Sequence, residues 1–435
     1  NLEEQQIAAQ DLQNYINKTA GFNLNIDKNK FSSIVFEKKE GLNAQSYELS
    51  VTPKKITIYA NDVAGYFYGV QTVKQLMAIE TSKDTRHTKY LVPSVTIKDG
   101  PRFKWRAFML DEARYFHGEV FVKQMLDQMA LLKMNTFHWH LIDDAGWRIE
   151  IKKYPLLTKV GAFRADSEIG TWKSGKTSGQ PHGGFYTQEQ IKDIVAYAKA
   201  RNINIVPEFE MPGHSSAAIA AYTWLGTAGI AIDVPVKFGR LYDNYDVTKP
   251  EVITFMKDVL TEIFELFPSE VIHIGGDEVG YEVWEKSSSV QKYMKENNIP
   301  TPADLQINFT NKISHYIEEN GRRMMGWNEI LGKNIHTDFA EKQADKEAET
   351  VLSKNVIVHF WKGDLGLLTD AAKKGYGIVN SLHSSTYLDY NYKSIPLEKA
   401  YAFDPIPEGL DAQYHENIYG LGCQMWSEWT PTNAD

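Results

Sequence analysis

Two adjacent carboxylates, Asp277 and Glu278, follow a short apolar stretch and a pair of glycines in the order His273-Ile274-Gly275-Gly276-Asp277-Glu278. Glycine lets backbone and ligand approach closely, and neighbouring residues leave a strand end in different directions. One carboxyl group can therefore protonate a leaving group while the other faces a different part of the substrate. Two nearby carboxylates also push their pKa values apart, which suits acid–base chemistry. A solvated acidic turn is the alternative, and the preceding apolar stretch and glycines argue against it.

Two histidines separated by one residue, His138 and His140, place both imidazoles on one face of an expected strand. With Asp143 and His214 they could form a zinc site, because zinc hydrolases built on barrels use His-x-His at a strand end. Such a site needs further histidines at later strand ends, where this sequence carries tryptophans or carboxylates. We therefore favour hydrogen-bonding support of the carboxylates and expect no metal and no other cofactor.

Three tryptophans, Trp327, Trp361 and Trp426, come from three different expected strand ends. Indoles that converge at one end of a barrel would form a narrow apolar cage, which suits a small apolar group such as a methyl. Packing beneath the loops is the competing interpretation for each of them taken singly.

Two arginines bracket the first expected strand of the same region, since Arg106 precedes it and Arg114 follows it. A guanidinium offers a fork of donors suited to carboxylates or vicinal hydroxyls, although a surface ion pair is equally compatible with either position. The polar and aromatic set around this rim is completed by Tyr387, Asp389, Glu428 and Glu329.

The elements that must position these residues are short apolar strands alternating with helices over residues 101–435. We expect strands at 107–110, 135–140, 203–207, 271–275, 323–327, 356–361, 377–381 and 419–424, and helices at 119–133, 187–201, 249–266, 303–320 and 365–374. Eight such strands favour a parallel (β/α)8 TIM-type barrel, and the doubly wound alternative loses support because no Gly-x-Gly-x-x-Gly turn follows the first strand. Few residues follow the last strand, so we expect the barrel to lack its final helix in this chain.

Candidate chemistry residues cluster where barrel enzymes place their sites, at or just past the carboxyl ends of the strands. They are Asp111, His138, His140, Asp143, Glu208, Glu210, Asp277, Glu278, Trp327, Trp361 and Trp426. So many polar residues from most of the strands are hard to explain by stability alone.

Residues 1–100 read as a separate small α+β domain, and two domains agree with the length of 435 residues. The expected helices are 3–17 and 63–79, the second capped at Asn61-Asp62, and the expected strands are 32–37, 47–52 and 55–60. Gly100-Pro101 marks the boundary to residues 101–435.

Composition narrows the class further. The formal net charge is −9 and no dense Lys/Arg run exists, which argues against a nucleic-acid partner. Apolar stretches such as 216–221 are far shorter than the ~20 residues that cross a bilayer. Cys423 is the only cysteine, so no internal disulfide forms. The chain begins at Asn1 without a leader, so we expect any signal peptide to be absent or already removed.

Taken together, the motifs of residues 101–435 resemble those of the family 20 glycoside hydrolases, the β-N-acetylhexosaminidases. The stretches that carry the resemblance are Arg106-Ala107-Phe108-Met109-Leu110-Asp111, His138-Trp139-His140-Leu141-Ile142-Asp143-Asp144, Gly183-Gly184-Phe185-Tyr186-Thr187, Pro207-Glu208-Phe209-Glu210-Met211-Pro212-Gly213-His214, His273-Ile274-Gly275-Gly276-Asp277-Glu278, Trp327-Asn328-Glu329 and Trp426-Ser427-Glu428. Residues 1–100 resemble the α+β domain that precedes the barrel in this family.

The resemblance implies a retaining exo-β-N-acetylhexosaminidase that acts on a carbohydrate with a terminal β-linked GlcNAc or GalNAc, through an oxazolinium intermediate formed by the substrate's own acetamido group. It implies that Glu278 is the acid and later the base, that Asp277 orients the acetamido nitrogen, and that Tyr387 binds the acetamido oxygen. The remaining implied substrate-binding or supporting residues are Arg106, Glu428 and Asp389 at the sugar hydroxyls, Trp327, Trp361 and Trp426 around the acetamido group, and Asp143 and His214 in support of the acid.

Three other functions stay open at this stage. One is release of a disaccharide such as lacto-N-biose, which loops 164–185 and 383–418 would decide. Another is a metal-dependent amidohydrolase built on His138 and His140, and the third is an inactive carbohydrate-binding barrel, against which the presence of Glu278 argues. A carbohydrate-scavenging role predicts a periplasmic or secreted location. The oligomeric state is left open.

Overall fold

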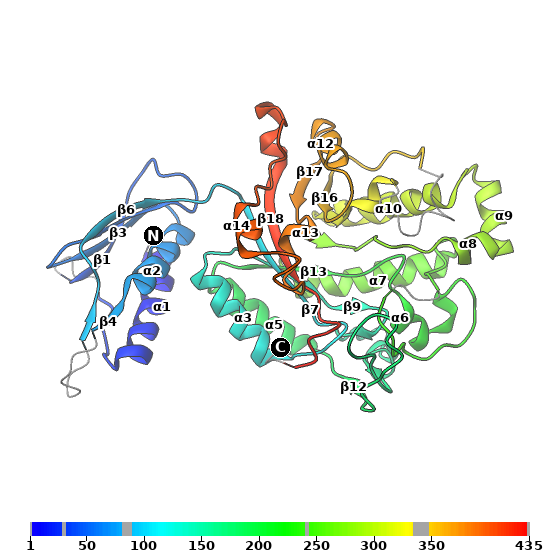
Figure 1. The fold of residues 1–435 in the computed structure, drawn as a ribbon, viewed down its shortest axis with the longest axis horizontal. Helices are drawn as coiled ribbons and strands as arrows, with labels where there is room; N and C mark the ends of the chain where they lie inside the picture. The colour runs from blue at the N-terminus through cyan, green and yellow to red at the C-terminus, as the bar shows by residue number, and fades with distance from the viewer. Residues whose placement is uncertain (1, 28–31, 81–88, 240–242, 334–347, 433–435) are drawn as a thin grey trace. The chain divides into compact units, whose positions relative to one another are not determined.

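The structure, a computed structural model, describes residues 2–27, 32–80, 89–239, 243–333 and 348–432 (Figure 1). The chain forms two compact units. The first comprises Asn1–Lys104 with Lys123–Asn135 and Ala196–Ile203, and the second comprises Trp105–Val122, Thr136–Val195 and Asn204–Asp435.

The first unit contains a four-stranded sheet in the order β1-β3-β2-β6, with bounds Ile34–Lys38, Ile56–Ala60, Tyr47–Val51 and Val95–Asp99. Strands β1 and β3 are parallel, whereas β2 runs antiparallel to β3 and β6. Two helices, α1 (Leu2–Ala20) and α2 (Val63–Leu76), pack against each other, and α2 packs on β2 and β3. The α+β fold expected for this region is confirmed, and β6 and the pair β4 (Ala78–Glu80) and β5 (Lys89–Leu91) are additional elements.

Helix α2 begins and packs as its sequence predicts. The Asp62 carboxylate accepts the backbone N–H of Gly65 at 2.7 Å, which is the N-cap that the sequence indicates. Gly69 lets the helix approach the sheet closely, because a Cβ at that position would lie 2.5 Å from the Cγ2 of Ile58.

The second unit is a closed barrel of eight parallel strands in the order β13-β14-β15-β16-β17-β18-β7-β8. Their bounds are Asn204–Glu208, Val271–His273, Arg323–Trp327, Val356–Phe360, Gly377–Asn380, Ile418–Met425, Trp105–Asp111 and Thr136–His140. Each overlaps one strand expected from the sequence, so the (β/α)8 prediction is confirmed.

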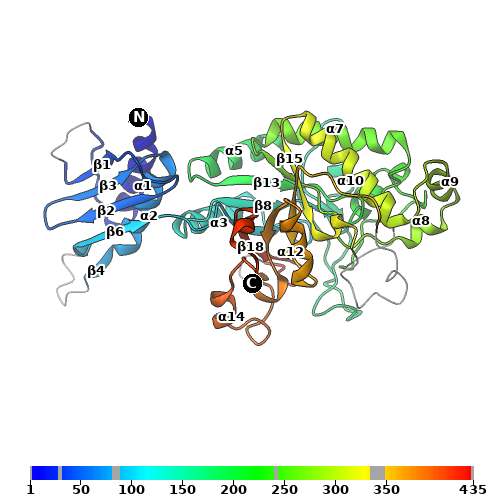
Figure 2. The same ribbon diagram turned by 90° about the horizontal axis from the view of Figure 1, so that it is seen from above.

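The helices of the βα repeats also fall where the hydrophobic period places them. They are α3 (Glu119–Leu131), α5 (Gln188–Lys199), α7 (Pro250–Leu266), α10 (Pro302–Glu319) and α12 (Leu365–Lys373). Figure 2 shows α7 and α10 side by side outside the barrel. The buried residues of α7 recur every three or four positions, as expected of a helix that packs on a sheet: Val252, Phe255, Met256, Val259, Leu260, Ile263 and Leu266.

The barrel interior is packed in layers. An apolar layer near the amino ends of the strands contains Trp105, Ala107, Val206, Met325, Ile357 and Val379. Because strand side chains alternate, the next inward positions lie closer to the carboxyl ends, and several of these are polar: His138, Glu208, His273 and His359. The interior is therefore apolar at one end and polar at the other, where the chemistry residues lie.

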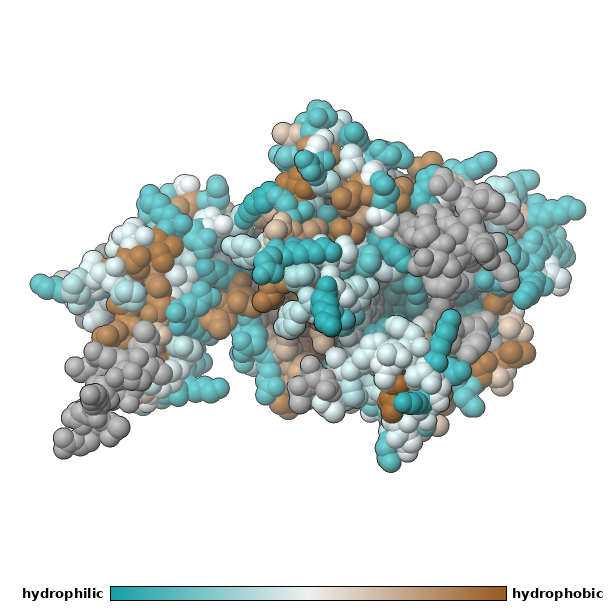
Figure 3. All heavy atoms as spheres, viewed as in Figure 1, coloured by the Kyte–Doolittle hydropathy of each residue, from teal (hydrophilic) through white to brown (hydrophobic). Residues whose placement is uncertain are grey.

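Long connections follow some of the strands at their carboxyl ends. Between β8 and α5 lie two small hairpins, β9 (Ile142–Asp143) with β10 (Gly146–Trp147) and β11 (Phe163–Arg164) with β12 (His182–Gly183). Among the described residues, no helix combines the length and apolar character needed to cross a bilayer. Hydrophilic residues predominate on the face shown in Figure 3.

Candidate active site

Glu208, the last residue of β13, is the hub of the buried polar layer. Its carboxylate accepts the indole N–H of Trp327 at 2.9 Å and lies 2.9 Å from Nε2 of His138 and 2.8 Å from Nδ1 of His273. Nδ1 of His140 also contacts it. Burial would raise the pKa of Glu208, but the surrounding imidazoles outweigh burial and hold that pKa well below its ordinary value. Glu208 is thus a buried carboxylate that fixes side chains from three strands.

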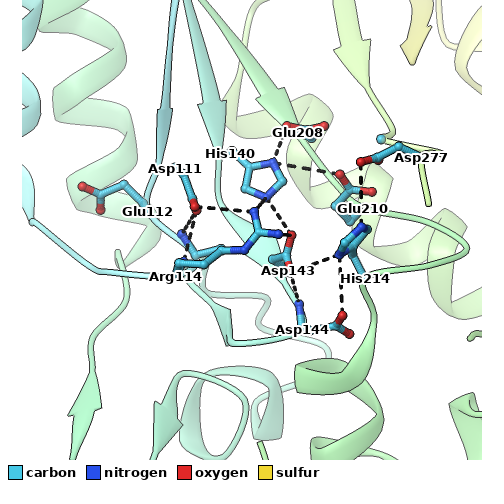
Figure 4. A network of polar contacts seen from close by, with 12 residues as sticks. Asp111, Glu112, Arg114, His140, Asp143, Asp144, Glu208, Glu210, His214 and Asp277 are labelled. Carbon is cyan, nitrogen blue, oxygen red and sulfur yellow. Dashed lines mark hydrogen bonds and ion pairs between the residues drawn. The ribbon is translucent and has the colours of Figure 1, made fainter. Parts of the chain in front are cut away.

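His140 connects Glu208 to Asp143, and Figure 4 shows the polar contacts that link these residues. Nε2 of His140 lies 3.1 Å from Asp143 Oδ2, and Nη2 of Arg114 lies 2.8 Å from the same oxygen. Burial alone would lower the pKa of His140, yet Glu208 and Asp143 raise it to about 10. The Asp143 carboxylate is therefore held between two cations, and its pKa is lowered.

His214 connects Asp143 to the adjacent carboxylates Asp277 and Glu278. Its Nδ1 lies 3.2 Å from Asp143 Oδ1, and its Nε2 lies 3.8 Å from Asp277 Oδ2 and 3.8 Å from Glu278 Oε2. Nearby carboxylates raise the pKa of His214 well above its ordinary value although burial opposes this. The imidazolium therefore lies between the carboxylate of Asp143 and those of Asp277 and Glu278. That Asp143 and His214 support the acid stays a prediction.

Asp277 and Glu278 have different surroundings, as acid–base work on one substrate requires. Burial raises the pKa of Asp277 to about 7, with Glu329 and Glu278 adding to the rise and His214 opposing it. The Glu278 side chain is 25% exposed and adopts a left-handed backbone, with φ of 48°. One carboxyl group thus lies in the buried wall while its neighbour faces the open side.

Glu210 explains why a glycine precedes this pair. Both of its carboxylate oxygens are buried without a hydrogen-bond partner among the described residues. Burial, Asp277 and Glu208 together raise its pKa well above the ordinary value. Gly275 has φ of 66°, and a Cβ there would lie 1.6 Å from Glu210 Oε2. The sequence marked Glu208 and Glu210 as rim residues but assigned neither a role.

An aromatic wall lies beside the carboxylates. Trp327 and Trp426 have ring centroids 6.0 Å apart, Trp426 and Tyr387 are 6.1 Å apart, and Tyr387 stacks on Trp361 at 6.2 Å with an interplanar angle of 11°. Trp327 in turn stacks on His359 at 4.1 Å. The structure therefore brings the three tryptophans together, with Tyr387 as the link between two of them.

A second group of polar residues lies at the Arg114 end of this wall. The Arg114 guanidinium lies 5.1 Å from the ring centroid of Trp426. Burial raises the pKa of Glu428 to about 7 although Arg114 opposes it, and burial likewise raises the pKa of Asp389 to about 7. Two protonatable acids and a permanent cation suit a neutral partner rich in hydroxyl groups.

Arg106 does not belong to this group, and its expected position at the sugar hydroxyls is wrong. It is the second residue of β7, five residues before the rim position Asp111, a separation of roughly 16 Å along a strand. Since its neighbours Trp105 and Ala107 face the barrel interior, alternation points Arg106 outward. Arg114, on the loop after β7, is the arginine of the site.

Among the residues that the structure describes, three groups of side chains have the composition of metal ligands: His138, His273 and His359; His140, Glu208 and Glu210; and Asp143, Asp144 and His214. Within the first, His273 Nε2 already pairs with His359 Nδ1 at 3.2 Å, and His359 Nε2 pairs with the Ser381 hydroxyl at 2.8 Å. In the third, Asp144 accepts the backbone N–H of Ser216 at 2.9 Å. In these two groups the donors and acceptors serve one another, which favours the supporting role over a metal centre.

Fold and site together define the class: a (β/α)8 barrel whose carboxylates and tryptophans meet at the carboxyl ends of its strands. Sequence comparison then names the family. The model for "Glycosyl hydrolase family 20, catalytic domain" matches residues 103–435, and that for "Glycosyl hydrolase family 20, domain 2" matches residues 2–100. The chain belongs to glycosyl hydrolase family 20.

Individual relatives agree with this assignment. A β-hexosaminidase of Porphyromonas gingivalis is 35% identical over 404 residues, covering 90% of this chain and 48% of the relative. A β-hexosaminidase of Vibrio furnissii is 35% identical over 415 residues, covering 91% of this chain and 63% of the relative. The chain thus spans about half to two thirds of the length of these curated relatives.

Solved structures show the same fold. An exo-β-N-acetylglucosaminidase of Vibrio harveyi in complex with N-acetylglucosamine superposes with a TM-score of 0.81 and 31% identity, covering 98% of this chain and 65% of that chain. A β-N-acetylhexosaminidase of Bacteroides fragilis superposes with a TM-score of 0.77 and 29% identity, covering 97% of this chain and 80% of that chain.

Proposed function

We propose that the chain is a retaining exo-β-N-acetylhexosaminidase that removes a terminal GlcNAc or GalNAc by substrate-assisted catalysis. The observation that carries the proposal is the pair Asp277 and Glu278, which lie 3.8 Å from the His214 imidazole and beside an aromatic wall. Its relatives named β-hexosaminidase and the Vibrio harveyi structure with bound N-acetylglucosamine support the substrate class.

In the first step, the substrate's acetamido oxygen attacks C1 while Glu278 protonates the departing glycosidic oxygen. Asp277 accepts the acetamido N–H and stabilises the positive charge of the oxazolinium ring. An oxygen tethered at C2 gains an effective molarity of roughly 10⁵–10⁸ M from proximity, provided that its conformer is selected. Glycosidases of this kind are a recognised exception to the two-carboxylate scheme, since the substrate supplies the nucleophile.

In the second step, Glu278 takes a proton from water, and the resulting hydroxide opens the oxazolinium ring at C1. Two inversions give net retention. The partly exposed position of Glu278 suits both roles, because the leaving group and the incoming water use the same open side.

The aromatic wall supports recognition of the N-acetyl group. The series Trp327, Trp426, Tyr387 and Trp361 provides an apolar surface for the methyl, and the Tyr387 hydroxyl can donate to the acetamido oxygen. Burial raises the pKa of that hydroxyl well above its ordinary value, so it stays protonated and remains a donor. Arg114, Glu428 and Asp389 would then bind the hydroxyl groups of the same sugar.

Release of a single sugar is favoured over release of a disaccharide by the residues beyond Glu428. Trp429 packs edge-on against Phe238 at 5.8 Å and against Trp172 at 5.3 Å. This cluster would close the pocket beyond the sugar that Glu428 binds. A periplasmic or secreted location remains a prediction, which fractionation of the native cells would test.

The deciding experiment compares 4-nitrophenyl β-N-acetylglucosaminide with 4-nitrophenyl β-glucoside and 4-nitrophenyl β-lacto-N-bioside, with and without EDTA. We expect cleavage of only the first compound, unaffected by the chelator. Cleavage of the bioside alone would establish disaccharide release instead. Activity lost with EDTA would revive the amidohydrolase alternative, and no cleavage of any compound would favour an inactive carbohydrate-binding barrel.

A further inference from the structure

Glu329 lies in the short 3-10 helix η2 (Asn328–Leu331), immediately after the last residue of β15. Its Oε2 accepts the indole N–H of Trp361 at 3.0 Å. The preceding Asn328 holds the backbone of the same region, since its Oδ1 accepts the Trp361 N–H at 3.0 Å and its Nδ2 donates to the Lys362 carbonyl at 3.0 Å. Trp361 is thus fixed from η2 at both its backbone and its ring.

The need for such fixing follows from the place of Trp361 in the fold. It comes one residue after the end of β16, so no strand ladder determines its ring orientation. Its ring nevertheless stacks on Tyr387 with an interplanar angle of 11°, whereas the other ring pairs of the aromatic wall are tilted. A polar tether on one edge of an indole sets the plane of the whole ring.

We propose that Glu329 is a positioning residue, whose carboxylate orients the Trp361 indole against Tyr387. The inference rests on the proposed function, in which Trp361 and Tyr387 border the N-acetyl group of the substrate. Glu329 itself touches none of the reacting atoms.

The charge of Glu329 acts on Asp277 together with the other groups that face it. These are Glu208, Glu210 and His214 from the β13 side, Glu278 from its own segment, Tyr387 from the loop after β17, and Glu329. Burial is the main reason that the pKa of Asp277 is raised, and Glu329 is the first of the charged groups that add to the rise. Removing this charge therefore lowers the pKa of Asp277.

Two substitutions separate the hydrogen bond from the charge. Glu329→Gln removes the charge but keeps an acceptor for the Trp361 indole, whereas Glu329→Ala removes both. Glu285→Gln, which removes an exposed carboxylate on α8 (Glu282–Lys286), is the matched control for net charge. The measurement is kcat and KM for 4-nitrophenyl β-N-acetylglucosaminide across a pH series, with thermal melting as the test of folding.

We expect the acid limb of kcat/KM to move to lower pH in both Glu329 variants and to stay in place in Glu285→Gln. We expect KM to remain within about twofold of wild type in Glu329→Gln. In Glu329→Ala we expect it to rise about tenfold, because a Trp361 ring without its hydrogen bond would bind the substrate less well by about the free energy of one such bond. In a Trp361→Ala background the rise on adding Glu329→Ala should vanish, because the two residues would act as one unit.

An unchanged KM in Glu329→Ala, or an equal rise with and without Trp361, would overturn the positioning role. An acid limb that does not move would overturn the charge effect, and Glu329→Gln decides this point even where Glu329→Ala fails to fold. If the wild-type protein does not cleave the substrate, the proposed function is itself wrong, and the inference that rests on it falls as well.

Discussion

The guanidinium of Arg114 lies 2.8 Å from the carboxylate of Asp143, and both side chains are buried. Asp143 thus joins Arg114 to His214, whose Nε2 lies 3.8 Å from Asp277 and from Glu278. A buried ion pair of this kind is costly to break from one side, because the remaining charge loses its partner.

Replacing Arg114 should therefore lower kcat/KM far more than replacing Arg106. We expect Arg114→Ala to lower kcat/KM by about 10²- to 10³-fold, from the loss of a buried charged donor. Arg106→Ala should change it by less than about threefold, because that side chain leaves the far end of β7 and points outward. Steady-state kinetics on 4-nitrophenyl β-N-acetylglucosaminide measure both, and comparable losses would show that our placement of the sugar-binding arginine is wrong.

The assignment of Glu278 as the acid predicts a dependence on the leaving group. Glu278→Gln should lower the rate by about 10²- to 10⁴-fold for N-acetylglucosaminides with poor leaving groups, which need protonation. The loss should be much smaller for the activated 4-nitrophenyl compound in the first step. Rates measured over a series of aryl leaving groups give the slope, and a slope equal to that of wild type would assign the proton to another residue.

Asp277 predicts the acid side of the pH profile. Its pKa is raised to about 7, so the carboxylate needed to stabilise the oxazolinium is lost as pH falls through that value. We expect kcat/KM to decline below neutrality in wild type, and Asp277→Asn to be slow at every pH without this decline. A thiazoline mimic of the cyclised acetamido group should inhibit wild type strongly. If that mimic bound no better than free N-acetylglucosamine, substrate assistance would be excluded.

Glu428 predicts a pH-dependent stability effect. Its pKa in the folded protein is about 7, above the ordinary value of 4.5. The stability that Glu428 contributes is therefore fully present below its ordinary pKa and is lost as pH rises through about 7. Glu428→Gln should therefore raise the free energy of unfolding relative to wild type at about pH 8, by up to about 3 kcal/mol, with little gain at about pH 4. Thermal melts at both pH values test this, with Glu285→Gln as the exposed control; a gain that is equal at both would refute it.

Gly275 predicts a steric requirement imposed by Glu210. Gly275→Ala should lower stability by about 3 kcal/mol or more and abolish activity, since the new Cβ would lie 1.6 Å from Glu210 Oε2. Gly321→Ala is the matched control, because Gly321 has a similar φ of 71° but no heavy atom within 4 Å of the added Cβ. Equal losses in the two variants would mean that backbone strain, and not the contact with Glu210, is the cause.

Sequence periodicity was sufficient to predict the barrel. Each predicted strand from 107–110 to 419–424 overlaps an observed one, because a buried parallel strand is a short apolar run whose ends are marked by glycine or polar residues. Strand β6 and the small β4–β5 pair were missed. Strands β5 and β6 flank Val92-Pro93, where a proline interrupts a short apolar run, and β4 falls on residues that the expected helix 63–79 partly covers, whereas α2 ends at Leu76.

What the sequence by itself determined is the set of residues that end the strands, since strand ends are local in the chain. Trp327 ends β15 as expected, and Asp277 and Glu278 follow shortly after β14. Only the tertiary structure decided which of these groups meet and how each is charged. Arg106 and Arg114 are eight residues apart in the chain but belong to opposite ends of one strand, and alternation around the closed barrel separates them. The low pKa of Glu208 and the raised pKa of Glu210 depend on partners from other strands, which no local pattern contains.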